Sequence, residues 1–403
     1  MVDAATSFRS LSAKAMTQSG SSKGGGLSVS ILPANDLEAY SELGRNGLCA
    51  PAQHPLWIEE WQANVAPDGI IAMVEGNGRP VYALALEIER SGPFRIARFM
   101  SGRHANGNFP AADPSFLEAG SFDPAALLRA VRAARPDIDA LVLERLLPEH
   151  EGVANPLLAL PNFPSPNVSL AVSLAGGFDV LLSRVSGKRK KKKHRSQTRK
   201  FEAAGGYRRI TAKTPEEVSR LLEAFFAMKE ARFRKIGVAN VFGEIEVKNF
   251  FRSLFRDALA ENPPPFVLHA LEVGGVLRAV TGSSLSGKRL VCEFGAIQED
   301  DLAHTSPGDF LFFDTIAEAC RQGLEVFDFS VGDEPYKRLW CDIETRHFDV
   351  VAPLTAKGTL LAQVLRLKAG VKAWIKNSPT MWRLAKLLRK RTAGQPPQTA
   401  AED

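Results

Sequence analysis

The pattern of apolar and polar positions divides the chain into two consecutive sets of strands and helices. In the first set, residues 27–32 alternate as in a strand, and Asn35 or Asp36 is placed to cap a short helix. A second helix is predicted to begin at Pro55, because bulky apolar residues follow it at helical spacing. Three strands separated by Gly-containing turns, a helix, a short strand, a Pro-rich loop and a closing strand follow, at 70–74, 80–88, 94–99, 123–134, 140–143, 156–166 and 168–174.

The second set repeats the order of the first. Residues 207–211 alternate as a strand, and Thr214 with Glu217 forms a capping box at the start of a helix. Two helices, three strands, a helix and a last strand follow, at 215–235, 244–260, 266–273, 276–285, 289–296, 310–322 and 325–330. This order predicts an α+β fold with two domains in tandem.

The composition of the chain indicates its number of domains and its cellular compartment. The 403 residues, 45% of them hydrophobic, exceed what a single core usually supports, which also favours two domains. The four cysteines are scattered without a CxxC pair, so neither a metal site nor a disulfide framework is indicated. No apolar run approaches the roughly 20 residues that cross a bilayer. We therefore expect a cytoplasmic protein, with a disordered leader at 1–26 and a disordered tail at 392–403.

Two motifs in the second set resemble those of a known family. They are Ser306-Pro307-Gly308-Asp309-Phe310-Leu311 and Phe327-Asp328-Phe329-Ser330-Val331-Gly332-Asp333-Glu334-Pro335-Tyr336-Lys337-Arg338-Leu339-Trp340. They are similar to the PG, FDF and GDE-YK-W pattern of CelD-like or BioF2-like acyltransferases. That family belongs to the Gcn5-related N-acetyltransferase (GNAT) superfamily and is related to the Fem peptidoglycan transferases. The resemblance covers residues 169–351, with a weaker echo at 54–61.

The resemblance carries expectations about fold and activity. It implies two GNAT-like domains, at 27–175 and 176–356, each with a mixed, mainly antiparallel sheet flanked by helices. It also implies an enzyme that transfers an acyl group from acyl-CoA, with an acetyl or longer chain, to an amine. The pathway that it suggests is envelope or exopolysaccharide biosynthesis.

Acyl transfer to an amine needs a base for the ammonium group and an acid for the departing thiolate. Glu293 is a carboxylate within the otherwise apolar strand 289–296, where loss of solvent would raise its pKa and suit it as the base. Strand alternation places it opposite both Cys292 and Phe294. A solvated residue on an amphipathic strand is the alternative interpretation.

The resemblance implies further site residues after the last strand. Tyr336 lies in the short helix that holds the acidic tyrosine of superfamily enzymes, and Lys337 would balance oxyanion charge or bind a phosphorylated acceptor. Asp333 would position the acceptor or cap that helix. Trp340 and His269 complete the expected substrate contacts, although a lone histidine in a strand is more often structural.

Ser306, Pro307 and Gly308 are the candidate contacts to the cofactor phosphates. A helix that begins at Gly308 would present backbone N–H groups and its positive dipole end to an anion. The usual Arg/Gln-x-x-Gly-x-Gly/Ala loop of the superfamily is absent, and Asp309 adds a negative charge. An ordinary capped helix entry is the competing interpretation.

Two basic segments are each compatible with more than one kind of binding partner. The run 188–200 fits a solvated helix between domains, a contact to the phosphates of CoA or a carrier lipid, or a nucleic-acid contact. Residues 357–391 contain basic but no acidic residues, and their spacing predicts amphipathic helices broken at Ser378-Pro379. Such helices either pack on the domain or lie on a membrane, which would place the protein peripherally at the inner face.

Two alternatives to acyl-CoA chemistry follow from these segments. One is a Fem-like aminoacyl transferase that uses charged tRNA, with the basic run as the tRNA contact. The other is a non-catalytic protein on the same fold that binds a membrane or nucleic acid.

Overall fold

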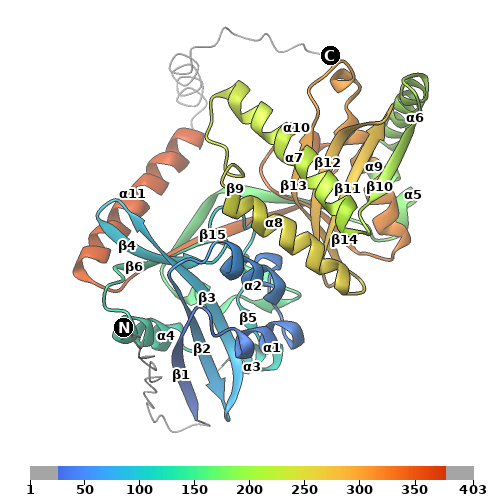
Figure 1. The fold of residues 1–403 in the computed structure, drawn as a ribbon. Coiled ribbons are helices and arrows are strands. Elements are labelled where there is room, and N and C mark those ends of the chain that lie inside the picture. Colours follow the sequence, from blue (N-terminus) through green and yellow to red (C-terminus); the bar gives the residue numbers. More distant parts are fainter. Residues whose placement is uncertain (1–25, 121, 378–403) are drawn as a thin grey trace, which may run out of the picture.

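A computed structural model describes residues 26–120 and 122–377. Its central element is one continuous mixed sheet with the strand order β1-β2-β3-β4-β6-β15-β9-β14-β13-β12-β11-β10 (Figure 1). The strands are β1 (Leu27–Pro33), β2 (Gly69–Gly76), β3 (Arg79–Ser91), β4 (Phe94–Phe99), β6 (Ala140–Leu146), β9 (Asn162–Ser173), β10 (Tyr207–Thr211), β11 (Phe266–Val273), β12 (Val276–Ser286), β13 (Arg289–Ile297), β14 (Val326–Val331) and β15 (Ile343–Pro353). The short β5 (Ala111–Ala112) pairs with β3, and β7 (Glu149–His150) pairs with β8 (Val153–Ala154).

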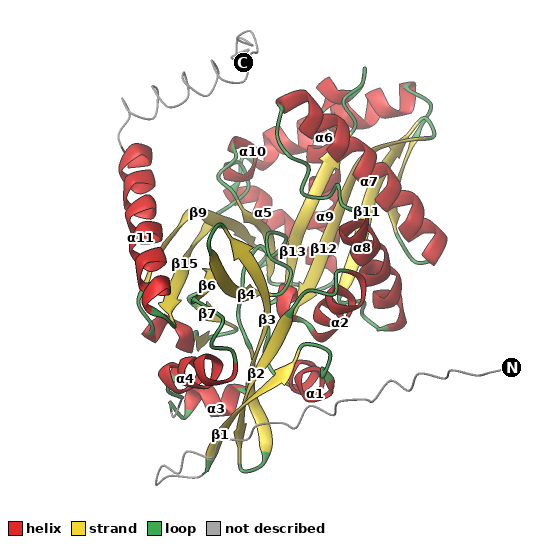
Figure 2. Ribbon diagram, turned by 60° about the vertical axis from the view of Figure 1, so that its left-hand side comes forward, coloured by secondary structure: helices red, strands yellow, loops and turns green. Residues whose placement is uncertain are grey.

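The helices cover both faces of this sheet (Figure 2). They are α1 (Glu38–Asn46), α2 (Pro55–Asn64), α3 (Pro114–Glu118), α4 (Pro124–Ala134), α5 (Gly177–Arg184), α6 (Gly187–Ala203), α7 (Pro215–Ile236), α8 (Ile245–Asp257), α9 (Pro307–Arg321), α10 (Pro335–Arg338) and α11 (Ala356–Asn377). No helix in the described ranges is long and apolar enough to cross a membrane.

The two halves of the sheet have the same topology, which confirms the predicted repeat of one order of strands and helices. In the first half, β1 to β4 are antiparallel neighbours and β6 joins β4 in parallel. In the second half, β10 to β13 are antiparallel neighbours and β14 joins β13 in parallel. Each parallel pair is connected through a helix, α4 in one half and α9 in the other.

The halves exchange their last strands. β9 follows the first half in sequence but pairs with β14 of the second, and β15 follows the second half but pairs with β6 of the first. β9 and β15 also pair with each other, which joins the two sheets into one. The domain boundary expected at residue 175 therefore stays a prediction, because β9 lies before it in sequence and bonds to strands after it.

Local sequence signals explain many of the boundaries. Thr214 accepts a hydrogen bond from the N–H of Glu217 at 3.3 Å, and the carboxylate of Glu217 accepts one from the N–H of Lys213 at 2.8 Å. The expected cap at Asn35 or Asp36 is wrong, because α1 begins at Glu38 without a side-chain cap. The Pro-rich loop was also predicted too long, since β9 begins at Asn162 and includes two prolines.

A hydrophobic cluster with side chains from both halves packs at their boundary. Trp57 of α2 contacts Phe250 of α8 with ring centroids 5.2 Å apart, and Trp61 contacts the same ring at 5.0 Å. All three side chains are buried. Such aromatic contacts bury large apolar areas, so they hold the two halves in a fixed arrangement.

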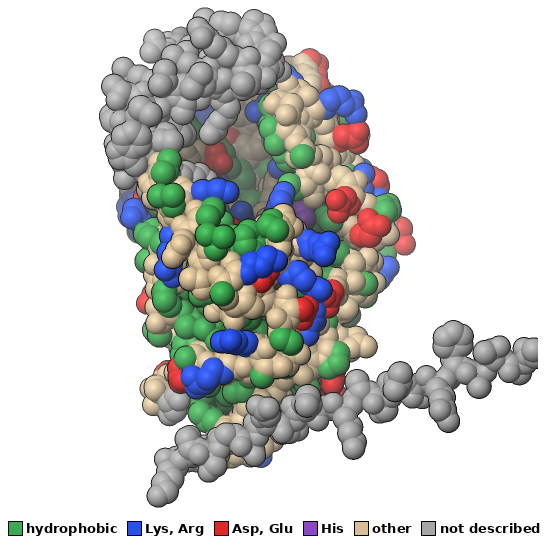
Figure 3. All heavy atoms as spheres, turned by 90° about the vertical axis from the view of Figure 1, so that its left-hand side faces the viewer, with side chains coloured by type: hydrophobic (Ala, Val, Ile, Leu, Met, Phe, Trp, Pro, Cys, Tyr) green, Lys and Arg blue, Asp and Glu red, His purple; other side chains and the backbone are tan. Residues whose placement is uncertain are grey.

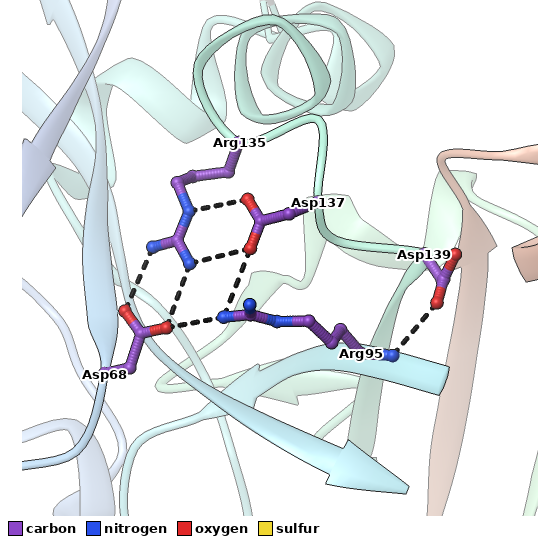
Figure 4. A network of polar contacts seen from close by, with 5 residues as sticks. All are labelled: Asp68, Arg95, Arg135, Asp137 and Asp139. Atoms are coloured by element: carbon purple, nitrogen blue, oxygen red, sulfur yellow. Dashed lines mark hydrogen bonds and ion pairs between the residues drawn. The ribbon is translucent and has the colours of Figure 1, made fainter. Parts of the chain in front are cut away.

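A polar network attaches α11 to the first half. Figure 4 shows Asp68, Arg95, Arg135 and Asp137 in an ion-pair cluster, next to Asp139, which accepts a hydrogen bond from the N–H of Arg95. The same Asp139 carboxylate accepts from Thr355 at 2.9 Å and pairs with Lys357 at 3.3 Å. The start of the predicted amphipathic segment is therefore fixed to the domain. Residues 378–391 of that segment, with the leader 1–25 and the tail 392–403, lie outside the described residues.

Candidate active site

The sheet of the second half opens between its two parallel strands. β13 and β14 pair only at Arg289 with Val326, Leu290 with Phe327 and Val291 with Asp328. Both strands continue past these pairs, β13 to Ile297 and β14 to Val331. Their backbones are therefore unpaired with each other beyond Val291 and Asp328, at the end of the strands where ligands commonly bind in open sheets.

Glu293 lies at a β-bulge on this opening. Gly282 pairs with Phe294 and the next residue, Ser283, pairs with Cys292, so Glu293 is the extra residue. Cys292 packs with α9, whereas Phe294 packs with α7 and α8 on the other face. The expectation that these two neighbours share one face is wrong, because the bulge interrupts the strand alternation.

The carboxyl group of Glu293 is enclosed by neutral donors. Ser284 donates to Oε1 at 2.5 Å, and the side-chain amide of Asn106 donates to Oε2 at 2.7 Å and to the main-chain oxygen of Glu293 at 2.8 Å. Removal from solvent raises the pKa of Glu293 to about 7, while the two hydrogen bonds act in the opposite direction. The direction agrees with the sequence-based expectation. A carboxyl group with this pKa exchanges protons near neutral pH.

Glu293 faces a cavity of about 870 Å³ between the two halves. The first half contributes Asn106 and the segment 147–152, and the second half contributes residues of β13 and β14. The exchanged strands β9 and β15 also line the cavity. The charged lining comprises Glu149, Glu151, Glu293, Glu325, Asp328 and Glu344 against Lys288, Arg289 and Arg346. The acidic excess suits a cationic ligand such as an ammonium group.

Two neutral histidines belong to the wall of this cavity. Burial lowers the pKa of His150 and of His347 to about 4. His150 lies 3.3 Å from the hydroxyl of Ser286, whereas neither ring nitrogen of His347 has a hydrogen-bond partner, although its side chain is buried. Nothing in the sequence pattern identifies either histidine as a site residue.

A second bulge lies across the opening, on β14. Asp328 pairs with Ala171 and Val331 with Ser169, so β14 has one extra residue there. The carboxylate of Asp328 accepts from the N–H of Ser330 at 2.7 Å and pairs with Arg289 at 2.9 Å. Ser330 has φ of 60°, a left-handed conformation that costs about 1 kcal/mol or more for a non-glycine residue. Sequence reasoning missed Asp328 and Arg289 as members of the site.

Tyr336 lies at the opposite face of the sheet from Glu293. Its ring stacks on Phe312 of α9, with centroids 5.9 Å apart and 12° between the planes, and contacts Phe329 of β14 edge to face. The residue is 41% exposed. Burial of its hydroxyl, with a smaller effect from Cys292, raises its pKa, so the phenol stays protonated at neutral pH.

Lys337 is buried and holds the turn before Tyr336. Its ammonium group donates to the main-chain oxygens of Ser330 at 3.3 Å and Val331 at 3.0 Å, and pairs with Glu334 at 2.9 Å. These three contacts match its three N–H donors. Asp333 does not cap α10, whose N-cap is Glu334; it pairs instead with Arg338 at 2.6 Å.

The entry of α9 lies beside the end of β13. A Cβ atom on Gly308 would come within 3.0 Å of Ile297, the last residue of β13. Ser306 precedes Pro307 with φ of 58° and makes no side-chain cap. Its main-chain oxygen accepts from the N–H groups of Asp309 and Phe310. Capping by the Ser306 side chain is therefore not observed.

The basic helix α6 lies along this entry. Gln197 donates to the main-chain oxygens of Thr305 at 2.7 Å and Ser306 at 3.1 Å. Lys193 pairs with Asp309 at 3.0 Å, which offsets the negative charge that Asp309 brings to the helix start. The predicted basic helix and the predicted helix entry thus form one surface.

Trp340 and His269 lie apart from the cavity. Trp340 is buried in the cluster beneath α9, with the ammonium group of Lys190 3.7 Å from its ring centre. His269 bonds Thr211 of the edge strand β10 at 3.2 Å, and burial lowers its pKa to about 4. Neither residue lines the cavity that contains Glu293.

Comparisons with known proteins agree with this geometry. Residues 188–338 match the family described as acetyltransferase (GNAT) domain. The crystal structure of FemX superposes with a TM-score of 0.54 at 11% identity, covering 81% of this chain and 97% of that chain. The structure of L-PGS from Bacillus licheniformis superposes with a TM-score of 0.50 at 12% identity, covering 86% and 98%. No curated protein sequence matches the chain.

The matched segment contains both bulges, the opening between β13 and β14, the α9 entry and α10. The superpositions on FemX and L-PGS, at low identity, show a shared fold alone. Residues 188–338 are therefore an acetyltransferase domain of the GNAT type, and the chain shares its fold with FemX.

Proposed function

We propose that the protein is an N-acyltransferase that moves an acyl group from acyl-CoA to an amine. The observation that carries this proposal is the opening between β13 and β14, with the carboxyl of Glu293 on one face and the phenol of Tyr336 on the other. A thioester in that opening would be reached by an amine from the cavity. The resemblance to CelD-like proteins suggests an amine on a sugar nucleotide, a lipid-linked sugar or an amino acid in envelope or exopolysaccharide assembly as acceptor.

The chemistry follows from the two protonation states. Glu293 accepts a proton from the acceptor ammonium, which its pKa of about 7 permits near neutral pH. The freed amine attacks the thioester carbonyl carbon, and the tetrahedral intermediate expels the CoA thiolate. Tyr336 gives its proton to that thiolate, since burial keeps the phenol protonated. The acceptor nitrogen loses its second proton as the amide forms, and that proton returns through solvent to the Tyr336 phenolate. Lys337 acts as a positioning residue that holds the turn carrying Tyr336.

Turnover with thioesters tests the proposal. Purified protein mixed with acetyl-CoA or longer acyl-CoA and a panel of amines should release CoA, detected with a thiol reagent.

Glu293→Gln and Tyr336→Phe should each lower kcat by roughly 10²-fold or more. Glu87→Gln and Tyr82→Phe make the same chemical changes at buried positions of the first half and should leave kcat unchanged. Absence of CoA release with every thioester and amine would refute the proposal. Unchanged cellular function in both site variants would favour a binding protein.

A second candidate is aminoacyl transfer from charged tRNA. It is favoured by the solvent-exposed basic face of α6, formed by Lys188, Lys192, Arg195 and Arg199 beside the α9 entry. If tRNA binds there, replacing these four residues with Ala should abolish aminoacyl transfer and reduce the salt dependence of RNA binding. Transfer from acyl-CoA should tolerate the change better. Lys190, Lys191 and Lys193 are unsuitable for this test, because they contact Trp340, Asp179 and Asp309 within the fold.

Peripheral membrane attachment is proposed for α11. Leu360, Val364, Leu367 and Val371 form an exposed stripe at helical spacing, and Leu361 and Ala362 pack on the domain. Figure 3 looks at the side of the molecule on which α11 lies and shows apolar and basic side chains intermingled there. An apolar stripe flanked by basic residues is typical of a helix in the plane of an anionic membrane.

Vesicle sedimentation tests this attachment. The protein should pellet with vesicles containing phosphatidylglycerol and not with pure phosphatidylcholine. The double variant Leu360→Ser/Leu367→Ser should lose this binding while keeping its thermal stability, because both side chains are exposed. Equal pelleting of the variant would contradict the proposal.

A further inference from the structure

The carboxyl of Glu293 is held in place across the boundary between the two halves. Asn106 lies in the segment between β4 and β5 of the first half, outside the residues that match the GNAT family. Its side-chain amide group donates to both the main-chain oxygen and the carboxylate of Glu293, 187 residues away in sequence. One amide thus fixes the bulged backbone and the reactive group together.

We propose that Asn106 is a positioning residue for the general base, so that the first half of the chain sets the reactivity of the active site in the second. This inference rests on the proposed N-acyl transfer. The amide N–H stabilises the charged carboxylate, and its second bond prevents the bulge from turning Glu293 away from the cavity. Ser284, from β12 of the second half, supplies the other hydrogen bond.

The surroundings of Asn106 support a dedicated contact. Two residues later, Asn108 donates to the main-chain oxygen of Glu144 at 2.8 Å and accepts from Gln53 at 3.3 Å. Asn108 therefore fastens the same segment within the first half. Asn106 is directed at the second half, and it lines the cavity beside Glu293.

Charged and titratable groups from several elements line the cavity around Glu293. Asp328 on β14 is the charged group that acts on the Glu293 carboxyl, and Arg289 of β13 pairs with it. His150 of β7 and His347 of β15 have pKa values of about 4 and stay neutral. Glu149, Glu151, Glu325, Glu344, Lys288 and Arg346 complete the charged lining.

The test is the pH dependence of kcat/KM for Asn106→Ala in the full-length protein. Loss of the donor should move the acid limb of the profile upward by about one pH unit, and so lower activity at pH 6.5 by about sevenfold more than at pH 9. Ser284→Ala should shift the limb in the same direction. Asn106→Gln, which keeps an amide donor, should restore part of the shift.

The matched control is Asn108→Ala, which makes the same change two residues away without a contact to Glu293. It should lower the melting temperature and leave the acid limb in place. An Asn106→Ala protein that loses stability but keeps the wild-type limb would overturn the inference, because that result is expected of a structural residue.

A readout without turnover separates this inference from the proposed function. The ionisation of Glu293 is followed by the carboxylate infrared band that disappears in Glu293→Gln. If wild-type protein releases no CoA, the proposed function fails. The inference about Asn106 is then tested by the pH midpoint at which the Glu293 carboxylate band appears, which Asn106→Ala should raise. A midpoint equal to that of the wild type overturns it.

Discussion

At the scale of single residues, Glu87 is a buried carboxyl group outside the proposed active site, and burial changes its pKa. It is 8% exposed on β3 and accepts a hydrogen bond from the indole of Trp61 at 2.7 Å. Burial raises its pKa to about 7, more than the Trp61 bond lowers it. The folded state therefore holds this proton more tightly than the unfolded state, for which a value near 4.5 applies.

Glu87→Gln should change how stability depends on pH. In the wild type this residue lowers the free energy of unfolding as the pH rises from about 4.5 to 7, and the loss is complete above 7. Relative to wild type, the variant should gain about 3 kcal/mol between pH 4 and pH 8, because a shift of one pKa unit corresponds to 1.36 kcal/mol. Urea unfolding at both pH values checks this, and a pH-independent difference between the two proteins would contradict it.

At the scale of elements, α11 depends on one close approach to the sheet. Gly358 lies in its first turn, where a Cβ atom would come within 1.8 Å of the main-chain oxygen of Asp139. Only glycine allows the helix to lie this close to the start of β6. This contact orients the exposed apolar stripe of α11, together with the hydrogen bond of Asp139 to Thr355 and its ion pair with Lys357.

Gly358→Ala should reverse the usual effect of placing alanine in a helix. Alanine normally gains about 1 kcal/mol over glycine there, whereas the clash with a main-chain atom should cost about 1–3 kcal/mol. Gly370→Ala is the control in the same helix, because nothing lies within 4 Å of its Cβ position. Chemical unfolding should show one variant destabilised and the other unchanged or stabilised. Equal stability of the two would show that α11 does not need the close approach.

At the scale of the whole molecule, the exchanged strands make each half incomplete alone. β14 needs β9 on its outer edge, and β6 needs β15. The apolar cluster that contains Trp57 and Phe250 would also be exposed if the halves were separated. An unpaired strand edge and an exposed apolar face both promote aggregation.

A fragment spanning residues 176–356 should therefore be insoluble or lack fixed tertiary structure, although it contains the whole segment that matches the GNAT family. Co-expression with a fragment spanning residues 27–175 should recover a soluble complex, because β9 and β15 can then find their partners. Near-ultraviolet circular dichroism distinguishes the two outcomes. A native spectrum from residues 176–356 alone would show that the exchange is dispensable.

The sequence by itself determined the features that depend on neighbouring residues. Alternation and turn residues located most strands, as at 207–211 and 266–273, whose bounds the structure matches. The resemblance to CelD-like acyltransferases placed Tyr336 in a short helix, and the apolar flanks of Glu293 indicated a raised pKa. These signals are local, because period and capping act within a few residues.

Only the tertiary structure decided the exchange of β9 and β15, the bulge at Glu293 and its contact with Asn106. The alternation of β13 does not reveal the bulge, because the extra residue is defined by the partner strand. The Asn106 contact joins residues 187 positions apart, and nothing near Asn106 in the sequence signals it. The cavity likewise exists only once the Trp57 and Phe250 cluster has brought the two halves together.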